Sequence, residues 1–233
     1  MRAKNAIIMA AGMGERLRPL TLTTPKPLIS VNGVPMIESV IHAVRKNGIE
    51  EIYVVGGYRM EQLQYLGEKY PGLTLIKNPH YADANNISSL YAAREHLGDS
   101  LVLDGDQIIN NPDVLNPEFG RSGYNAVWRE DETEEWMLTL EDGVIKKCSR
   151  NGGSHGYQLY SVSRWSKEDG RRLADLVEKE FENGNTGIYW DDVPLFCYPD
   201  AFELGIVEMR PGDVIEIDSL RELAEADTRY GDG

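Results

Sequence analysis

The sequence has 233 residues, with 24 Lys and Arg against 38 Asp and Glu, and a formal charge of −14. This length suits one α/β domain that buries its core without disulfides or a structural metal. A surface this acidic repels nucleic acid and anionic membranes, so we expect no polynucleotide and no membrane partner, although local cations can still bind a small anion. The 2 Cys and 4 His residues form no paired metal spacing, which argues against a zinc site. The apolar run at 6–11 is too short for a signal peptide and no run reaches membrane-spanning length, so we expect a cytoplasmic protein.

The first half of the chain alternates apolar and amphipathic segments. The run NAIIMAA at 5–11 predicts a buried parallel strand. Further strands are expected at 28–31, 51–57, 73–77 and 100–103, and helices at 35–47, 59–70 and 87–97. This alternation with short connections predicts an α/β fold with a doubly wound, mostly parallel, Rossmann-like sheet. In such sheets ligands bind beyond the carboxyl ends of the strands.

After about residue 120 the pattern changes to short strands that suit antiparallel pairing. Strands are expected at 124–129, 136–140, 144–148 and 156–163, followed by a long helix at 167–183, strands at 203–208 and 214–217, and a last helix from Ser219. No repeat or linker separates the two halves. We therefore predict a single domain, 1–233, whose C-terminal half is an antiparallel elaboration of the same sheet.

A loop rich in glycine and cations follows the first strand. It reads AAGMGERLRPLT at 10–21, with PKPL at 25–28. Gly12 and Gly14 allow backbone N–H groups to approach phosphate oxygens, and Arg16 and Lys26 supply cations suited to a triphosphate. The loop lacks the GK[ST] of a Walker loop. It also lacks the third glycine and the acid closing the second strand that a dinucleotide fingerprint needs, which disfavours a Rossmann dehydrogenase.

The run GMGERLRPLT at 12–21, followed by TPKPL at 24–28, resembles the signature of the sugar-phosphate nucleotidyltransferase family. In that family a phosphate or phosphonate attacks the α-phosphate of a nucleoside triphosphate and pyrophosphate leaves. The resemblance implies that Arg16 and Lys26 bind and neutralise phosphates, that residues 1–120 bind the nucleotide, and that residues 121–233 bind the acceptor. It also implies that Asp106 holds Mg²⁺ together with Asp218.

The carboxylates themselves support this expectation. Asp104 and Asp106 are two apart after a strand, so an extended chain would place them on one face. Hard oxygen ligands suit Mg²⁺, which typically uses one or two carboxylates plus substrate phosphates. Asp104 is the weaker candidate, and Glu216 competes with Asp218.

The segment NPHYADANNISSL at 78–90 replaces the Gln-rich segment of many sugar enzymes and resembles bacterial phosphocholine cytidylyltransferases. Further matches to that group are VWRED at 127–131, EW at 135–136, YWD at 189–191 and EIDS at 216–219. The resemblance implies CTP and phosphocholine as substrates. For the base we expect Asn85, Asn86, Ser88 and Ser89, with backbone groups near Ala10 and Ala11, although helix capping explains Asn86 equally well.

The aromatic residues of the second half suggest the same acceptor. A quaternary ammonium donates no hydrogen bond, so proteins hold it against aromatic faces. The candidate acceptor contacts are Trp136, Tyr189 and Trp190, with Asp191 or Asp192 as counter-charge and Glu216 nearby, whereas Trp128 and Trp165 are expected in the core. A primary amine such as 2-aminoethylphosphonate or phosphoethanolamine is the alternative if carboxylates dominate. A sugar 1-phosphate enzyme and a nucleotide sensor without catalysis remain open, and the sequence carries no signal of oligomeric state.

Overall fold

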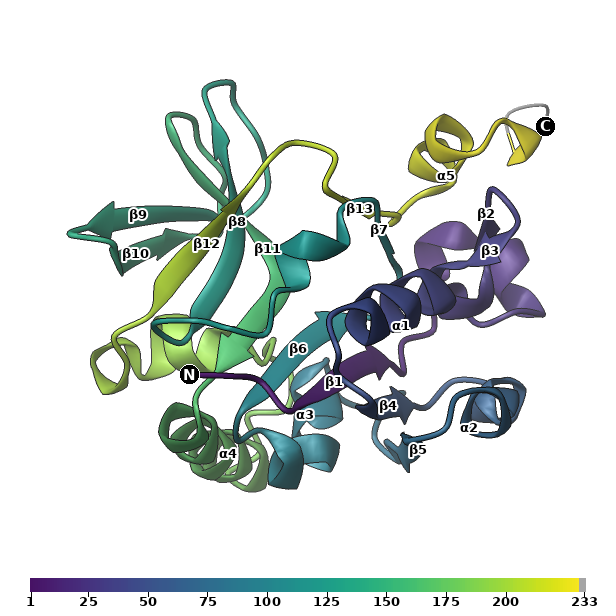
Figure 1. Ribbon diagram of the computed structural model, residues 1–233, viewed down its shortest axis with the longest axis horizontal. Coiled ribbons are helices and arrows are strands. Elements are labelled where there is room, and N and C mark those ends of the chain that lie inside the picture. The colour runs from purple at the N-terminus through teal and green to yellow at the C-terminus, as the bar shows by residue number, and fades with distance from the viewer. Residues whose placement is uncertain (231–233) are drawn as a thin grey trace.

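The computed structural model describes residues 1–230, and one nine-stranded sheet runs through both halves of the chain (Figure 1). Seven strands lie in the order β10-β9-β11-β6-β1-β4-β5, while β8 pairs with β11 and β12 with β8. The strands are β1 (Asn5–Ala10), β4 (Glu51–Gly56), β5 (Leu73–Lys77), β6 (Ser100–Asp104), β8 (Gly123–Arg129), β9 (Met137–Glu141), β10 (Val144–Ser149), β11 (Gly156–Trp165) and β12 (Gly205–Met209).

The central strands β6, β1, β4 and β5 are parallel, and helices cover both of their faces. Because side chains alternate along a strand, Ala6 and Ile8 of β1 pack with α1 (Met36–Lys46) and α2 (Tyr65–Lys69). Ile7 and Met9 pack on the opposite face with α3 (Ile87–Ala93) and α4 (Lys167–Glu182). This arrangement confirms the predicted doubly wound, mostly parallel fold.

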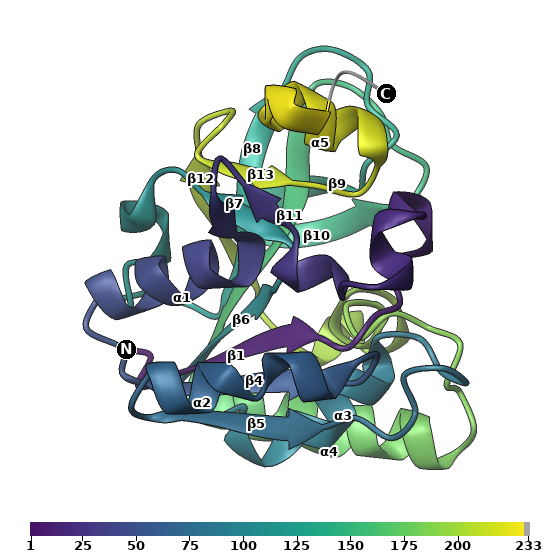
Figure 2. The same cartoon turned by 90° about the vertical axis from the view of Figure 1, so that its right-hand side faces the viewer.

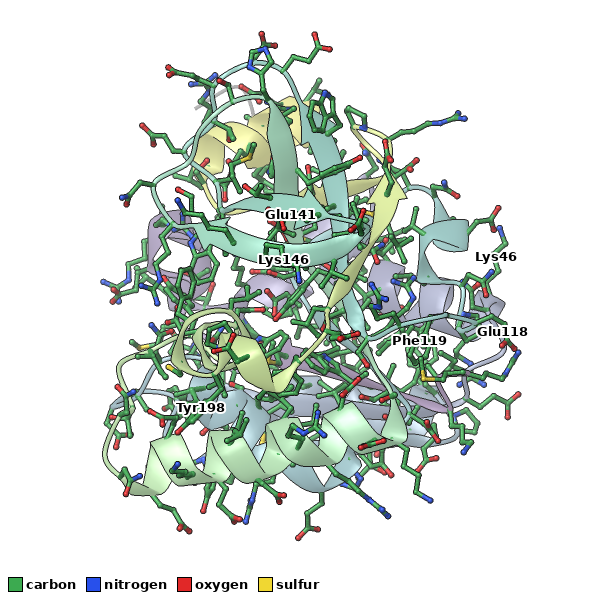
Figure 3. The ribbon with its side chains drawn as sticks, turned by 90° about the vertical axis from the view of Figure 1, so that its left-hand side faces the viewer. Lys46, Glu118, Phe119, Glu141, Lys146 and Tyr198 are labelled. Atoms are coloured by element: carbon green, nitrogen blue, oxygen red, sulfur yellow. The ribbon has the colours of Figure 1, made fainter. Side chains whose placement is uncertain are left out.

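Strand β11 joins the two halves of the chain. It runs antiparallel to β6, with Val162 opposite Leu103, and also pairs antiparallel with β8 and β9. The expected elaboration of the same sheet is therefore confirmed. The hairpin β9–β10, marked by Glu141 and Lys146 in Figure 3, projects from it. One pairing differs from the antiparallel expectation: β12 lies parallel to β8, and the chain between these two strands passes through β9, β10, β11 and α4.

Several local expectations are wrong in detail. The segment expected as a strand at 28–31 is a 3₁₀ turn, Lys26–Leu28, followed by a short strand β2 (Ser30–Val31) that pairs with β3 (Val34–Pro35). Proline at position 27 has no N–H to give to a ladder, so the chain turns there. The helix expected at 59–70 is a 3₁₀ turn, Met60–Leu63, before α2, and the helix expected at 87–97 ends as a 3₁₀ turn at Arg94–His96.

A two-stranded ribbon and a terminal helix cover the loop after β1. The ribbon pairs β7 (Gln107–Ile109) with β13 (Val214–Glu216), and α5 (Leu220–Ala226) follows it. A small buried cluster contains Leu17 of the loop, Ile217, which lies between β13 and α5, and Leu223 of α5. Figure 2 shows α5 above β2 and β3, beside the first loop. The expected last helix from Ser219 is confirmed, with Ser219 as its N-cap.

The remaining turns are short, and they include a π-helical turn at Val193–Cys197 and 3₁₀ turns at Glu15–Leu17, Leu20–Leu22, Pro112–Leu115, Pro199–Ala201 and Thr228–Tyr230. Within residues 1–230, no helix combines the length and the apolar character that crossing a membrane requires.

Candidate active site

The loop after β1 contains two glycines with different surroundings. Gly14 has φ 61°, and a Cβ built there would lie 2.8 Å from Lys26 Cβ, so the loop can pack on the Lys26 segment only with glycine at this position. The Thr21 hydroxyl donates to the Gly14 carbonyl at 2.9 Å and holds this turn. A Cβ at Gly12 would meet no atom within 4 Å, and Gly12 lines a cavity. The space next to the first glycine of the loop is therefore open.

That cavity, here called the nucleotide cavity, has a volume of about 390 Å³. Its lining brings together the loop, both predicted cations and both predicted metal carboxylates: Met9, Ala10, Gly12, Gly14, Glu15, Arg16, Lys26, Pro27, Asp106 and Asp218. A larger depression of about 540 Å³ lies at the amino ends of β1 and β4, around Asn5 and Glu51. It contains no residue of the loop, so the smaller cavity is the candidate nucleotide site.

Lys26 lies at the centre of the site. Its Nζ donates to the Asp106 carboxylate and, at 2.6 Å, to Asp218 Oδ1. Burial by itself lowers the pKa of Lys26, but the Asp106 and Asp218 carboxylates raise it above its usual value. Lys26 therefore stays protonated and charged over the physiological pH range.

Asp218 reaches this position through the β7–β13 ribbon, whose register places Glu216 opposite Gln107. The Glu222 carboxylate accepts from the backbone N–H groups of Asp218, at 2.7 Å, and Ser219, at 2.8 Å. Because Ser219 caps α5, the Asp218 side chain is free to face Lys26 and Arg16, whose guanidinium lies 3.0 Å away. These two cations lower the pKa of Asp218 against the opposing effect of burial.

A second cavity of about 340 Å³, here called the acceptor cavity, adjoins the first and shares Arg16, Asp106 and Asp218 with it. The other lining residues are Asn86, Asp104, Glu135, Trp136, Leu159, Ser161, Tyr189, Asp191 and Glu216. A group bound in one cavity would therefore meet a group bound in the other at these three shared residues.

Carboxylates dominate the acceptor cavity. Asp191 is only 7% exposed, and its Oδ1 has no hydrogen-bond partner in the described part of the chain. Burial raises the pKa of Asp191 to about 7. Burial, together with Asp106 and Asp218, also raises the pKa of Glu216 to about 7, although the Gln107 amide donates to Glu216 at 2.8 Å. This excess of acid favours a cationic ligand.

Two of the three predicted aromatic residues face the acceptor cavity. Trp136 and Tyr189 meet edge to face with their ring centroids 5.8 Å apart. The prediction that Trp190 contacts the acceptor is wrong. Its side chain is 1% exposed and packs on Trp165 in the core, with the ring centroids 6.1 Å apart. Trp128, expected in the core, is 43% exposed.

The prediction that Asp192 is a counter-charge for the acceptor is also wrong, because its carboxylate is 3% exposed and already has partners. It forms an ion pair with Arg150 and accepts from the Tyr189 backbone N–H at 2.9 Å. Asp192 therefore supports the wall of the acceptor cavity without lining it, and Asp191 is the acid that faces the cavity.

The predicted base contacts do not come together. Ser88 and Ser89 are buried and both accept from the Asn78 amide, at 2.9 and 3.1 Å. Neither of these serines nor Asn85, whose amide donates to the Gly187 carbonyl, lines either cavity. These hydrogen bonds instead connect the start of α3 to Asn78 and to Gly187. The Ala11 carbonyl is likewise occupied, by the Tyr58 N–H at 3.0 Å.

Sequence reasoning missed Leu159 and Ser161, and it left Asn86 open between a base contact and a helix cap. Asn86 makes no side-chain cap; it accepts from the Trp190 N–H at 2.9 Å and lines the acceptor cavity. Leu159 and Ser161 are two apart on β11, so ordinary strand alternation points both side chains to the face that borders the acceptor cavity. Which face of β11 borders the cavity is set by its pairing with β6 and β8, which the residue pattern alone does not show.

The carboxylates suit a magnesium ion held partly by substrate. Within residues 1–230, no group of three or more His, Cys, Asp or Glu residues is placed to hold a metal by itself. Asp106 and Asp218 nevertheless converge on one ammonium group. Two hard oxygen donors, completed by phosphate oxygens, match the usual coordination of Mg²⁺.

Comparison with known proteins agrees with this geometry. Residues 6–169 match the model of a family described as the MobA-like NTP transferase domain. The chain belongs to this nucleotidyltransferase family. The enzyme class implied by the loop at 10–28 is thereby confirmed.

Relatives of this nucleotidyltransferase cover nearly its whole length. It is 42% identical to the 2-aminoethylphosphonate cytidylyltransferase of Lancefieldella rimae, over 97% of this chain and 93% of that one. It is 36% identical to the choline-phosphate cytidylyltransferase of Streptococcus pneumoniae, over 93% and 94%. The solved structure of CTP:phosphocholine cytidylyltransferase from Streptococcus pneumoniae superposes with a TM-score of 0.90 at 35% identity, covering 98% of this chain and 99% of that one. These relatives are cytidylyltransferases named for phosphate- or phosphonate-bearing substrates.

Proposed function

We propose that this nucleotidyltransferase moves the cytidylyl group of CTP to a small phosphate or phosphonate that carries a cationic amine. An acceptor oxygen forms a bond to the α-phosphorus, the bond from that phosphorus to the bridging oxygen breaks, and its electron pair leaves with pyrophosphate. The observation that carries the proposal is the pair of adjoining cavities, one with Lys26 and Arg16 and one rich in carboxylates, which share Arg16, Asp106 and Asp218.

The reaction needs alignment and charge neutralisation more than proton transfer. A phosphate or phosphonate oxygen is already a nucleophile at neutral pH, so no general base is required. Lys26, held charged by its carboxylate partners, and Arg16, paired with Asp218 at 3.0 Å, are placed to bind phosphate oxygens. Asp106 and Asp218 would hold Mg²⁺, which when bound neutralises charge on the α-phosphate.

For the head group we propose a primary ammonium, as in 2-aminoethylphosphonate. Among residues 1–230 the buried Asp191 Oδ1 has no hydrogen-bond partner, and an ammonium N–H would satisfy it. With Trp190 in the core, only two rings face the cavity, and carboxylates make up more of its lining. The 42% identity to a 2-aminoethylphosphonate cytidylyltransferase supports the same choice.

Phosphocholine is the second candidate acceptor, and the Trp136–Tyr189 pair favours it. A quaternary ammonium against an aromatic face gains about 0.5–2 kcal/mol per contact. The 36% identity to a choline-phosphate cytidylyltransferase supports this acceptor.

The test is pyrophosphate release with each of the four nucleoside triphosphates against 2-aminoethylphosphonate, phosphoethanolamine, phosphocholine and glucose 1-phosphate. We expect CTP to be preferred, with 2-aminoethylphosphonate having the highest kcat/KM and glucose 1-phosphate inactive. Turnover of glucose 1-phosphate alone would contradict a cationic acceptor. Lys26→Ala and Asp106→Ala should each abolish release, as should EDTA, and an intact rate in either variant would contradict the site.

A further inference from the structure

Arg150 lines neither cavity, but it contacts Trp136 directly and is linked through Asp192 to Tyr189, the other aromatic residue of the acceptor cavity. It follows β10 directly, and Trp136 precedes β9 directly, so the pairing of Ser149 with Met137 places Arg150 and Trp136 side by side at one end of the hairpin. The Arg150 guanidinium carbon lies 5.6 Å from the Trp136 ring centroid. Arg150 therefore lies against Trp136 from outside the acceptor cavity.

The same guanidinium reaches the other wall through Asp192. Arg150 Nε donates to Asp192 Oδ1 at 3.0 Å, and its NH2 group donates to the same oxygen. Asp192 Oδ2 accepts from the Tyr189 backbone N–H at 2.9 Å. Since Tyr189 in turn meets Trp136 edge to face, the four residues form a closed ring of contacts.

Phe196 anchors this ring to the turn at Val193–Cys197. The Arg150 guanidinium carbon lies 3.7 Å from the Phe196 ring centroid, and Phe196 meets Trp136 edge to face at 5.5 Å. Three segments that are separate in sequence, around 136, 150 and 189–196, are thus joined at one guanidinium. A planar guanidinium suits this position, because two of its N–H groups converge on one Asp192 oxygen while it also lies near both ring centroids, whereas an ammonium is a compact point charge.

We propose that Arg150 is a positioning residue that fixes Trp136 and Tyr189 and thereby sets acceptor affinity and head-group selectivity. The proposal rests on the proposed function, because it concerns the acceptor of that reaction. Arg150 acts from outside the cavity, so its loss should leave the nucleotide cavity unchanged. A quaternary ammonium depends on the ring faces, whereas a primary ammonium can still pair with Asp191.

The experiment compares steady-state kinetics of Arg150→Ala, Arg150→Lys and wild type with CTP and with each cationic acceptor. We expect the kcat/KM for the acceptor to fall about tenfold or more in Arg150→Ala, because misplaced binding groups have effects of this order. The KM for CTP should stay unchanged. The kcat/KM of Arg150→Lys should lie between those of Arg150→Ala and wild type. Arg150→Ala should weaken the binding of phosphocholine, measured as substrate or as competitive inhibitor, more than that of 2-aminoethylphosphonate.

Arg94→Ala is the matched control. Arg94 also combines an ion pair, to Glu178 at 2.9 Å, with a guanidinium 4.2 Å from a ring centroid, that of Tyr91, but it lines neither cavity. Its removal should not change either KM. An equal change of the acceptor KM in Arg94→Ala and Arg150→Ala would overturn the proposal.

The double variant Arg150→Ala with Asp192→Asn separates positioning from the effect of a buried unpaired acid. It removes the orphaned Asp192 charge while keeping an oxygen for the Tyr189 N–H. Compared with Arg150→Ala, we expect the double variant to regain thermal stability but to keep the low kcat/KM for the acceptor. If it regained both, Arg150 would act only by neutralising Asp192, which contradicts the proposal. A wild-type enzyme inactive with every cationic acceptor would instead contradict the proposed function itself.

Discussion

At the scale of single residues, Gly12 and Gly14 have different roles within three positions. Gly14 is required by the fold, because its φ is 61° and a Cβ would approach Lys26 Cβ at 2.8 Å. Gly12 is not required by the fold, because its surroundings are open. Because this open space lies at the wall of the nucleotide cavity, we expect a bound nucleotide to occupy it.

Replacing the two glycines separates these roles. Gly14→Ala should lower the free energy of unfolding by about 1–2 kcal/mol or more, since a left-handed backbone strains alanine. Gly12→Ala should leave the melting temperature unchanged and raise the KM for CTP about tenfold, because the methyl group would occupy ligand space. Thermal unfolding and CTP kinetics measure both effects. An unchanged KM in Gly12→Ala would mean that no part of CTP lies over this glycine.

Asp191 makes the reaction sensitive to pH. Its pKa is raised by burial from the usual 3.8 to about 7, so the carboxylate that would pair with the acceptor ammonium forms only as the pH rises through about 7. The kcat/KM for a primary-amine acceptor should therefore rise through this range, since this parameter reports groups of the free enzyme. In Asp191→Asn this rise should disappear. Any rise that remains belongs to Glu216, whose pKa burial also raises to about 7, or to the acceptor phosphate, and an unchanged profile would exclude Asp191 as the titrating group.

The same pKa shift has the opposite consequence for stability. Between about pH 4 and pH 7 the folded protein holds a proton on Asp191 that the unfolded chain releases, because the folded pKa is about 7 against the usual 3.8. Stability from this group is present at low pH and is lost as the pH rises through about 7. Asp191→Asn should thus gain stability relative to wild type across this window, as thermal unfolding at a series of pH values would measure.

At the scale of elements, the start of α5 places the Asp218 carboxylate, the proposed metal ligand. Glu222 accepts from the backbone of both Asp218 and Ser219, so the capping box of the helix also fixes the residue before it. The ribbon β7–β13 brings the same residue beside Asp106. The position of Asp218 therefore depends on the helix cap as well as on its own ion pairs.

Glu222→Ala should lower the free energy of unfolding by about 1 kcal/mol, as lost caps do, and should also reduce kcat. Glu225→Ala is the control on the same helix, because within residues 1–230 the exposed Arg221 is the only ion-pair partner of Glu225. It should change neither quantity. Equal kcat values for the two variants would show that the cap does not position Asp218.

At the scale of the whole molecule, the two halves share one sheet through β11 and β6. The sequence has 4 tryptophans, all after residue 120, whereas the loop and Lys26 of the nucleotide cavity lie before it. Tryptophan fluorescence therefore reports one half and CTP binding acts mainly on the other. The common sheet should couple them.

We expect CTP at about 100 times its Kd to stabilise the protein by about 2.7 kcal/mol. The unfolding midpoints from tryptophan fluorescence and from far-UV circular dichroism should rise together, since unfolding of both halves is coupled. Lys26→Ala should abolish this rise. A shift of the circular dichroism midpoint without a shift of the fluorescence midpoint would show that the halves unfold separately.

The sequence by itself determined the sheet and the class of reaction. The continuous apolar run of β1 and the glycine and cation pattern of the loop are local properties, so they are visible in the order of residues. The same holds for Lys26, Arg16, Asp106 and Asp218, whose types and motif identified them before their contacts were known. The prolines around Lys26 and the shortened helices show the limit of this reasoning, because turn geometry there overrides the apolar pattern.

Only the tertiary structure decided which neighbours face the acceptor. Tyr189 and Asp191 line the cavity while Trp190 and Asp192 do not, because successive residues of one turn point in different directions. Ser88 and Ser89 were unavailable for a base because Asn78, which follows β5, already binds them. The acceptor wall depends on Arg150 and Phe196, which only the register of β9 and β10 brings beside Trp136. Residue type can suggest a contact, but register and packing determine the direction in which each side chain points.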